Sequence, residues 1–140
     1  MEEPIEPPHG GKCLLRVVNG AKALDFKLAD LKRVFYEYNR VIRGTGYYLK
    51  PVHKVYKNVK GSRRVYEYYG RYWWKLVRVN WGVRYVYVGR IKPLDVKVNP
   101  PGNPLEGLSL IREGWDVIIK CSDYEKFSEV FKGYKVVREL

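Results

Sequence analysis

The chain has 140 residues, of which 46% are apolar, and this is enough for one domain with a core of its own. Its net charge is +12, which favours an anionic partner. No apolar run reaches the roughly 18 residues that a membrane-spanning helix needs. The first residues, MEEPIEPPHGG, carry acids where a signal peptide needs bases. We therefore expect a cytoplasmic protein with a disordered tail at 1–11 and a single domain at 12–140.

Local patterns predict a strand and then a helix in the first third of the chain. The run CLLRVV at 13–18 is short, apolar and β-branched at its end, which is typical of a strand. Apolar residues recur every three or four positions over 28–43, so this segment is predicted to be a helix with Phe35 and Tyr38 in the core.

The segment 47–59 contains Pro51 and, with the lysine that follows it, carries Lys50, Lys54, Lys57 and Lys60. It is either an extended edge segment or a basic loop. The following β-rich runs are separated by residues that favour tight turns, Gly70-Arg71 and Asn80-Trp81-Gly82. They predict a three-stranded antiparallel meander with strands at about 63–69, 72–79 and 83–91.

Turns of these lengths would fix the register of the meander and sort its side chains onto two faces. One face would be aliphatic and would form the core. The other would be rich in Tyr, Trp, Lys and Arg, with Tyr66, Tyr68 and Trp73 together on it, and would face solvent. An ordinary cross-strand aromatic ladder is the alternative explanation of these rings.

The last third of the chain predicts a mixture of short elements. A possible edge strand at 94–98 is followed by a proline-rich loop at 99–104 and a short helical turn at 105–111. A buried strand is expected at 115–121, then a helix with a Ser122/Glu125 capping box, and a last strand at 134–138. The fold class is thus α+β: one antiparallel sheet, with the meander at its centre, packed against two to three helices.

Two cysteines, Cys13 and Cys121, belong to no CxxC pair. Two buried thiols are the favoured interpretation, and a disulfide is the alternative. The absence of Gln, the single Thr and Met, and 30% charged residues favour a thermophilic source, where intracellular disulfides occur.

Charge and aromatic residues gather in residues 40–92. This stretch holds fourteen Lys and Arg against one acid, Glu67, and twelve of the 21 aromatic residues. Cations bind phosphates and flat rings stack on bases, so the pattern predicts a nucleic-acid-binding surface.

Patterns of catalytic chemistry are missing from the sequence. His53 stands alone in the basic stretch, where a surface or phosphate-contacting role is favoured over catalysis. There is no cluster of carboxylates or histidines for a metal and no phosphate-binding glycine motif. Neither a paired zinc signature nor an RNA-recognition motif is present. We therefore expect a non-enzymatic protein without a cofactor or metal.

Two resemblances support a nucleic-acid partner. The run YGRYWWKLVRVNWGVRYVYVGRIKP, with its ending Tyr87-Val88-Gly89-Arg90, resembles the Tyr-rich basic hairpins of archaeal and mobile-element proteins. In size, charge and α/β pattern the whole chain is similar to ThermoDBP, the single-stranded DNA-binding family of the Thermoproteales. That resemblance implies an α+β domain, distinct from the OB-fold, with a basic aromatic cleft that binds single strands without sequence preference.

The sequence thus predicts a non-catalytic protein that binds single-stranded DNA with little sequence preference. Its predicted binding residues are Lys54, Lys57, Lys60, Arg63, Arg64, Tyr66, Tyr68, Trp73, Lys75, Arg78, Trp81, Arg84, Tyr85, Tyr87 and Arg90. The alternatives are a duplex-DNA binder, an RNA- or ribosome-associated protein of a thermophilic archaeon, an enzyme acting on nucleic acid, and a protein with an acidic protein partner. The oligomeric state stays open.

Overall fold

The structure is a computed structural model that describes residues 13–139. The disordered tail predicted at 1–11 lies outside these residues. In chain order the elements are β1 (Leu14–Val17), α1 (Gly20–Val41), η1 (Arg43–Thr45), β2 (Tyr47–Val59), β3 (Ser62–Val79), β4 (Gly82–Gly89), β5 (Ser109–Glu113), β6 (Asp116–Lys120), α2 (Cys121–Lys126), η2 (Ser128–Phe131) and β7 (Val136–Arg138). Within the described residues, no helix is both long and apolar enough to cross a membrane.

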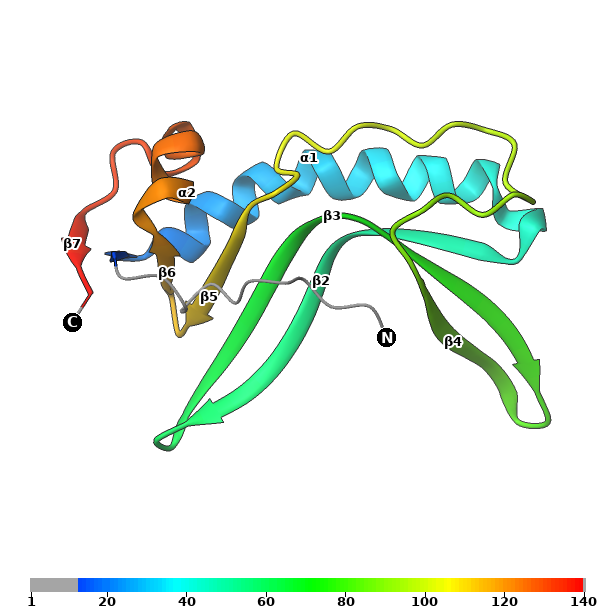
Figure 1. Ribbon diagram of the computed structural model, residues 1–140, viewed down its shortest axis with the longest axis horizontal. Helices are drawn as coiled ribbons and strands as arrows, with labels where there is room; N and C mark the ends of the chain where they lie inside the picture. The colour runs from blue at the N-terminus through cyan, green and yellow to red at the C-terminus, as the bar shows by residue number, and fades with distance from the viewer. Residues whose placement is uncertain (1–12, 140) are drawn as a thin grey trace.

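Seven strands of the described residues form one antiparallel sheet, and α1 lies across one of its faces (Figure 1). The strand order is β2-β3-β5-β6-β1-β7, and β4 also pairs with β3. The predicted α+β class is confirmed, although the sheet is larger than a three-stranded meander. The segment between β4 and β5 returns along α1, where the Tyr38 hydroxyl donates a 2.6 Å hydrogen bond to the carbonyl of Val98.

The strand β3 is continuous over 18 residues, so the predicted turn at Gly70-Arg71 is wrong. β2 pairs with β3 on both sides of Gly70, from Val59 opposite Ser62 to Tyr47 opposite Lys75. A glycine is compatible with extended backbone, and this long partner strand determines its conformation. The predicted turn before β4 is confirmed in position, with Asn80 and Trp81 as its two loop residues.

β2 is the edge strand, which decides between the two interpretations of residues 47–59. The register shifts between Lys50 and Val52, which places Pro51 in a β-bulge. The proline is tolerated because a bulged residue needs no backbone N–H for the ladder. Asn103 stabilises the bulge by donating to the carbonyls of Pro51 and Gly70 at 3.1 and 2.7 Å.

The β2–β3 hairpin closes through Lys60 and Gly61, which both have positive φ, 51° and 78°. Two such residues in succession are typical of a type I′ turn, whose twist matches that of the paired strands. Lysine is an unusual residue at the first position of such a turn, so the sequence gives little signal for this hairpin.

The first helix is longer at its N-terminus than the predicted 28–43. It begins at Gly20, where an added Cβ would lie 2.9 Å from Val17, so only glycine lets the helix start this close to β1. Leu24 is buried one helical turn before Leu28, where the predicted helix began. Phe35 and Tyr38 are core residues as predicted.

Towards the C-terminus, the strands predicted near 115–121 and 134–138 are confirmed as β6 and β7. The predicted edge strand at 94–98 is irregular backbone, and residues 109–113 form β5 where a helical turn was expected. The capping box is not formed: α2 begins at Cys121 without a side-chain cap, because the helix starts directly from the end of β6.

A disulfide joins Cys13 and Cys121, so the favoured interpretation of two buried thiols is wrong and the alternative holds. The Cα atoms lie 5.5 Å apart, because β1 and β6 are neighbouring antiparallel strands with Leu14 opposite Lys120. The bond closes a loop between residues 108 positions apart, which includes most of the chain.

Reduction of this disulfide is expected to destabilise the protein by about 4–5 kcal/mol, because the unfolded chain regains the entropy of a very long loop. Urea unfolding with and without a phosphine reductant measures this difference. The double variant Cys13→Ser/Cys121→Ser is the control and should be insensitive to reductant. Equal unfolding free energies of the native protein in the two conditions would contradict the prediction.

Candidate nucleic-acid interface

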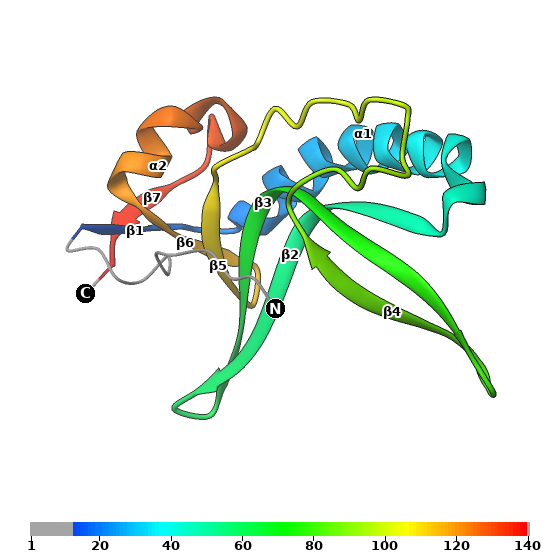
Figure 2. The same cartoon turned by 45° about the vertical axis from the view of Figure 1, so that its right-hand side comes forward.

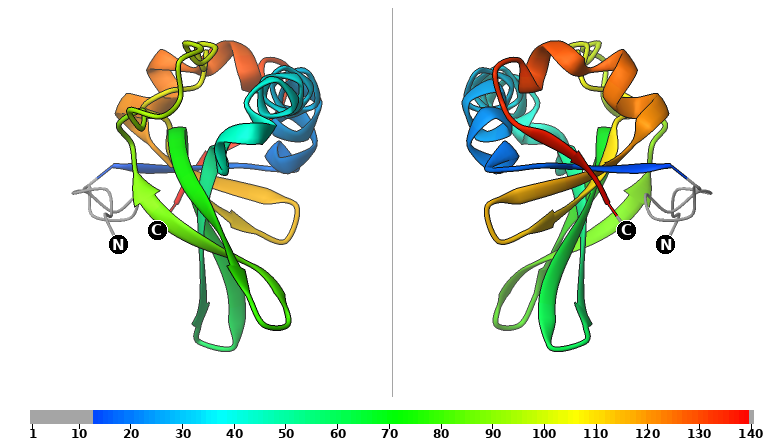
Figure 3. Two further views of the ribbon diagram at one scale, coloured as in Figure 1. Left: turned by 90° about the vertical axis from the view of Figure 1, so that its right-hand side faces the viewer. Right: turned by 90° about the vertical axis from the view of Figure 1, so that its left-hand side faces the viewer.

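The two long hairpins project from the body of the molecule as arms, and both point away from α1 (Figures 1 and 2). The β2–β3 arm ends at Lys60–Gly61 and the β3–β4 arm ends at Asn80–Trp81. Turning the molecule by 90° leaves both arm tips on the side opposite α1 (Figure 3). We call the sheet surface that faces away from α1 the inner face, and the α1 side the outer face.

The inner face carries a cluster of rings from three strands. The ring of His53 lies 5.4 Å from that of Tyr72 and 5.5 Å from that of Tyr87, between centroids. Tyr87 in turn lies 5.2 Å from Trp74. With their neighbours, these residues form the aromatic cluster: Tyr48, His53, Tyr68, Tyr72, Trp74, Tyr85 and Tyr87.

The centre of the aromatic cluster is packed and its edge is open. His53 is only 5% exposed, so the expected surface position of this histidine is wrong. Burial raises the pKa of Tyr72 from its ordinary 10 to about 12, as expected for a hydroxyl packed inside the cluster. Tyr85 is 54% exposed, and Trp81 at the tip of the β3–β4 arm is 83% exposed. Rings available for stacking therefore lie along the β3–β4 arm.

Cations accompany the rings on the inner face. Lys50 Nζ lies 4.8 Å from the centroid of Trp74, and Lys57 Nζ lies 4.8 Å from that of Tyr66. By strand register Arg78, opposite Val83, shares this face with Tyr85. The inner face thus presents alternating rings and cations from one arm to the other.

The only acid between residues 40 and 92, Glu67, is 1% exposed and lies on the outer side of β3. Its carboxylate accepts a hydrogen bond from Tyr69 and lies 3.0 Å from Arg112 Nε and 3.8 Å from Lys54 Nζ. Burial, and then the charge of Glu67, raise the pKa of Tyr69 above its usual value. The arms therefore contribute no carboxylate of their own to the inner face, where Glu113 of β5 lies opposite Arg64 and binds Arg64 and Ser62.

Several predicted binding residues lack the exposed position expected of them. Trp73 is 1% exposed and packs under α1, with its ring 6.2 Å from that of Tyr38. Tyr66 is 3% exposed and packs with Ile111 and Ile118. The error at Trp73 follows from the wrong turn, because in a continuous strand Trp73 and Tyr68 point to opposite faces. Tyr66 shares the face of Tyr68, and its burial follows from packing against β5 and β6.

Two predicted cations are paired with acids inside the molecule. Lys54 lies near the buried Glu67, and Arg64 Nε donates to Glu113 at 2.7 Å. The remaining predicted residues are distributed over both faces of the arms. The inner face and the arm tips hold Lys57, Lys60, Tyr68, Arg78, Trp81, Tyr85 and Tyr87, while the outer face holds Arg63, Lys75 and Arg84.

Arg90 follows the end of β4 and lines a pocket beside β3.

The sequence analysis missed four residues that the structure places on the inner face. They are Tyr48, Lys50, Tyr72 and Trp74. If side chains are taken to alternate between the faces of one strand that continues through Gly70, Tyr72 and Trp74 fall on the same face as Tyr66 and Tyr68.

The far end of the sheet, near β1 and β7, is charged but internally neutralised. Arg16 donates to Glu139, Glu113 and Asp116 at 2.8 to 3.0 Å. Hydrogen bonds from Arg16 and then Arg64 lower the pKa of Glu113 to about 2. Because the cations here are already paired with carboxylates, the candidate interface is confined to the arms and the aromatic cluster.

No metal site is evident within residues 13–139, where no group of three or more His, Cys, Asp or Glu could hold an ion. The comparisons with family models, curated proteins and solved structures give no match for this chain.

Acid should destabilise the protein through Glu113. Its folded-state pKa lies below its ordinary value of 4.5, so its contribution to stability is complete above about pH 4.5 and is lost as the pH falls towards 2. Urea unfolding of the native protein and of Glu113→Gln at pH 6 and pH 3 should show a smaller loss in the variant. Glu125→Gln, at an exposed position of α2, is the control and should lose as much stability as the native protein. Equal losses for Glu113→Gln and the native protein would contradict the assignment.

Proposed function

We propose that this protein is a non-catalytic nucleic-acid-binding protein that holds a single strand, DNA in preference to RNA, on the inner face. The observation that carries the proposal is the interleaving of rings and cations across β2, β3 and β4, which themselves contribute no carboxylate to that face. Cations neutralise phosphates while rings stack on bases of any sequence. Little sequence preference is therefore expected.

Unneutralised charge on the arms supports the proposal. Among the described residues, no acid lies within ion-pair distance of Lys57, Lys60, Lys75, Arg78 or Arg84. Like charges gathered on two arms repel each other in the free protein, and a polyanion relieves that repulsion.

The indole of Trp74 supports it as well. Trp74 Nε1 is buried and donates a hydrogen bond to none of the described residues. A buried donor without an acceptor costs about 1–3 kcal/mol. Trp74 also contacts Lys50, so a phosphate or base oxygen bound beside this cation would supply the acceptor once the side chains that cover the indole nitrogen move aside.

A duplex is the second candidate, and the tip of the β3–β4 arm favours it. Trp81 is 83% exposed at the turn, with Arg78 and Arg84 a few residues away on either strand. An exposed apolar ring flanked by cations is suited to insertion between the base pairs of a duplex bound between the two arms. RNA as the ligand, a thermophilic archaeal source and the relationship to the ThermoDBP family remain predictions.

Salt dependence tests the proposal. Fluorescence anisotropy with labelled single-stranded DNA, duplex DNA and RNA of equal length should show tightest binding to the single-stranded DNA, with affinity falling steeply as salt rises. The slope of log K against log salt should be roughly −0.7 for each phosphate contacted.

Arg78→Gln should make that slope less steep by about 0.7, because one inner-face contact is lost. Arg84→Gln, on the outer face of the same arm, is the matched control and should leave the slope unchanged. Affinity that does not respond to salt would remove the phosphate contacts from the proposal, and tighter duplex binding would favour the second candidate.

Stacking is tested by two tyrosines of equal exposure on opposite faces. Tyr85 on the inner face is 54% exposed and Tyr56 on the outer face is 56% exposed. Tyr85→Ala should weaken single-strand binding by about 1–3 kcal/mol, the usual value for one base stacked on a ring. Tyr56→Ala should leave it unchanged. Equal effects of the two variants in the same titration would show that the inner face is not the binding surface.

A further inference from the structure

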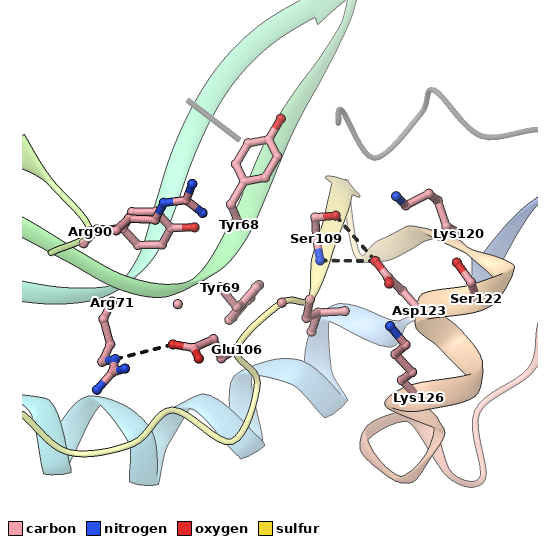
Figure 4. A pocket seen from close by; sticks show the side chains of 14 residues that line it. Tyr68, Tyr69, Arg71, Arg90, Glu106, Ser109, Lys120, Ser122, Asp123 and Lys126 are labelled. Carbon is pink, nitrogen blue, oxygen red and sulfur yellow. Dashed lines mark hydrogen bonds and ion pairs between the residues drawn. The ribbon is translucent and has the colours of Figure 1, made fainter. Parts of the chain in front are cut away.

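A pocket lies beside β3 at the point where one of its edges changes partner from β5 to β4; we call this point the fork. One edge of β3 pairs with β5 through Arg64–Tyr68 and with β4 through Trp73–Val79. Between these two segments the backbone of Tyr69 pairs with the loop at Gly107 and Leu108. The fork leaves a cavity of about 610 Å³ between β3, this loop and α2 (Figure 4).

The pocket is rich in positive charge. Among residues 13–139, four cationic and two acidic side chains line it, so these side chains sum to a charge of +2. Both acids are engaged: Glu106 lies 3.4 Å from Arg71, and Asp123 accepts hydrogen bonds from Ser109. The other three cations border the pocket from two sides, with Arg90 beside the rings of β3 and Lys120 and Lys126 at α2 (Figure 4).

Neutral hydrogen-bonding groups stand between these cations. Tyr68 and Ser122, which line the pocket, each carry a hydroxyl, whereas the hydroxyl of Ser109 already donates to Asp123. Oxyanions bind most strongly where several cations and hydroxyl donors converge, because each contact to an ionised group is a charge-assisted hydrogen bond. The side chains thus fit a compact dianion with several oxygen acceptors.

The pocket opens onto the inner face. Tyr68 and Tyr72 belong both to its lining and to the aromatic cluster. A strand that follows β3 along the inner face therefore reaches the pocket at Tyr68. There α2 and the loop at Glu106–Ser109 line the pocket together with β3.

We infer that this pocket binds a phosphate monoester, namely the terminal phosphate of a strand held on the inner face. A terminal monoester carries a charge of about −1.5 to −2 at neutral pH, whereas each internal diester carries −1. The net charge of the pocket matches the monoester, and a volume of 610 Å³ accommodates a terminal nucleotide. The inference rests on the proposed function for the strand, although a free mononucleotide offers the same chemistry.

The test compares one labelled oligonucleotide in three forms, with a 5′-phosphate, with a 3′-phosphate and with hydroxyls at both ends. By fluorescence anisotropy at low ionic strength, one phosphorylated form should bind about tenfold more tightly than the hydroxyl form, as one added charge-assisted contact would give. Equal affinity of all three forms would overturn the inference while leaving the proposed function intact.

The variant Lys126→Gln should reduce this preference to about twofold or less, and should leave the affinity for the hydroxyl form unchanged. Lys126 is exposed on α2, so its replacement is compatible with the fold. Lys132→Gln, also exposed but outside the pocket, is the matched control and should keep the full preference. A preference that survives in Lys126→Gln would overturn the assignment of the pocket.

A titration with deoxyadenosine monophosphate separates the pocket from the proposed function. Amide signals of Gly70, Ser109 and Ser122 in nitrogen–proton spectra should shift with the nucleotide, and deoxyadenosine without phosphate should leave them in place. If no oligonucleotide binds but these signals shift, the proposed function fails and the pocket is a mononucleotide site. If neither an end preference nor a shift is observed, the inference is overturned.

Discussion

β3 forms backbone hydrogen bonds along both of its edges, and the rest of the structure depends on this pairing. One edge pairs with β2 over most of its length, while the other is divided between β5 and β4. Because β3 is twisted, β5 and β4 pair with the same edge at different points and run in different directions from it. The two arms, the aromatic cluster that spans them and the pocket at the fork are all consequences of this division.

The two faces of β3 have different charge balances. On the outer face, Glu67, Arg112 and Asp25 are linked by contacts of 2.8 to 3.0 Å, so charge buried near α1 is compensated. Burying an uncompensated charge would cost several kcal/mol. The buried Glu67, the single acid of the basic stretch, pairs with Arg112 and so avoids that cost. The inner face receives no carboxylate from the arms and keeps its positive potential.

Sequence alone was enough for the basic and aromatic character of residues 40–92, for the stripe of α1 and for the turn at Asn80–Trp81. It failed at Gly70, because a glycine between two β-rich runs is equally compatible with a turn and with a continuous strand. The long-range pairing with β2 decided between them. That one difference moved Trp73 into the core and Trp74 to the inner face, and it concealed the fork with its pocket.

The composition of the inner face bears on sequence preference in the proposed complex. Adenine is read by the amides of Asn or Gln and cytosine by the carboxylates of Asp or Glu. The chain contains no Gln, and the single acid of the basic stretch is buried on the outer side. The groups that remain on the inner face are mainly rings and cations, which interact with features common to every nucleotide. A surface of this kind can bind a strand tightly while having few means to distinguish one base from another.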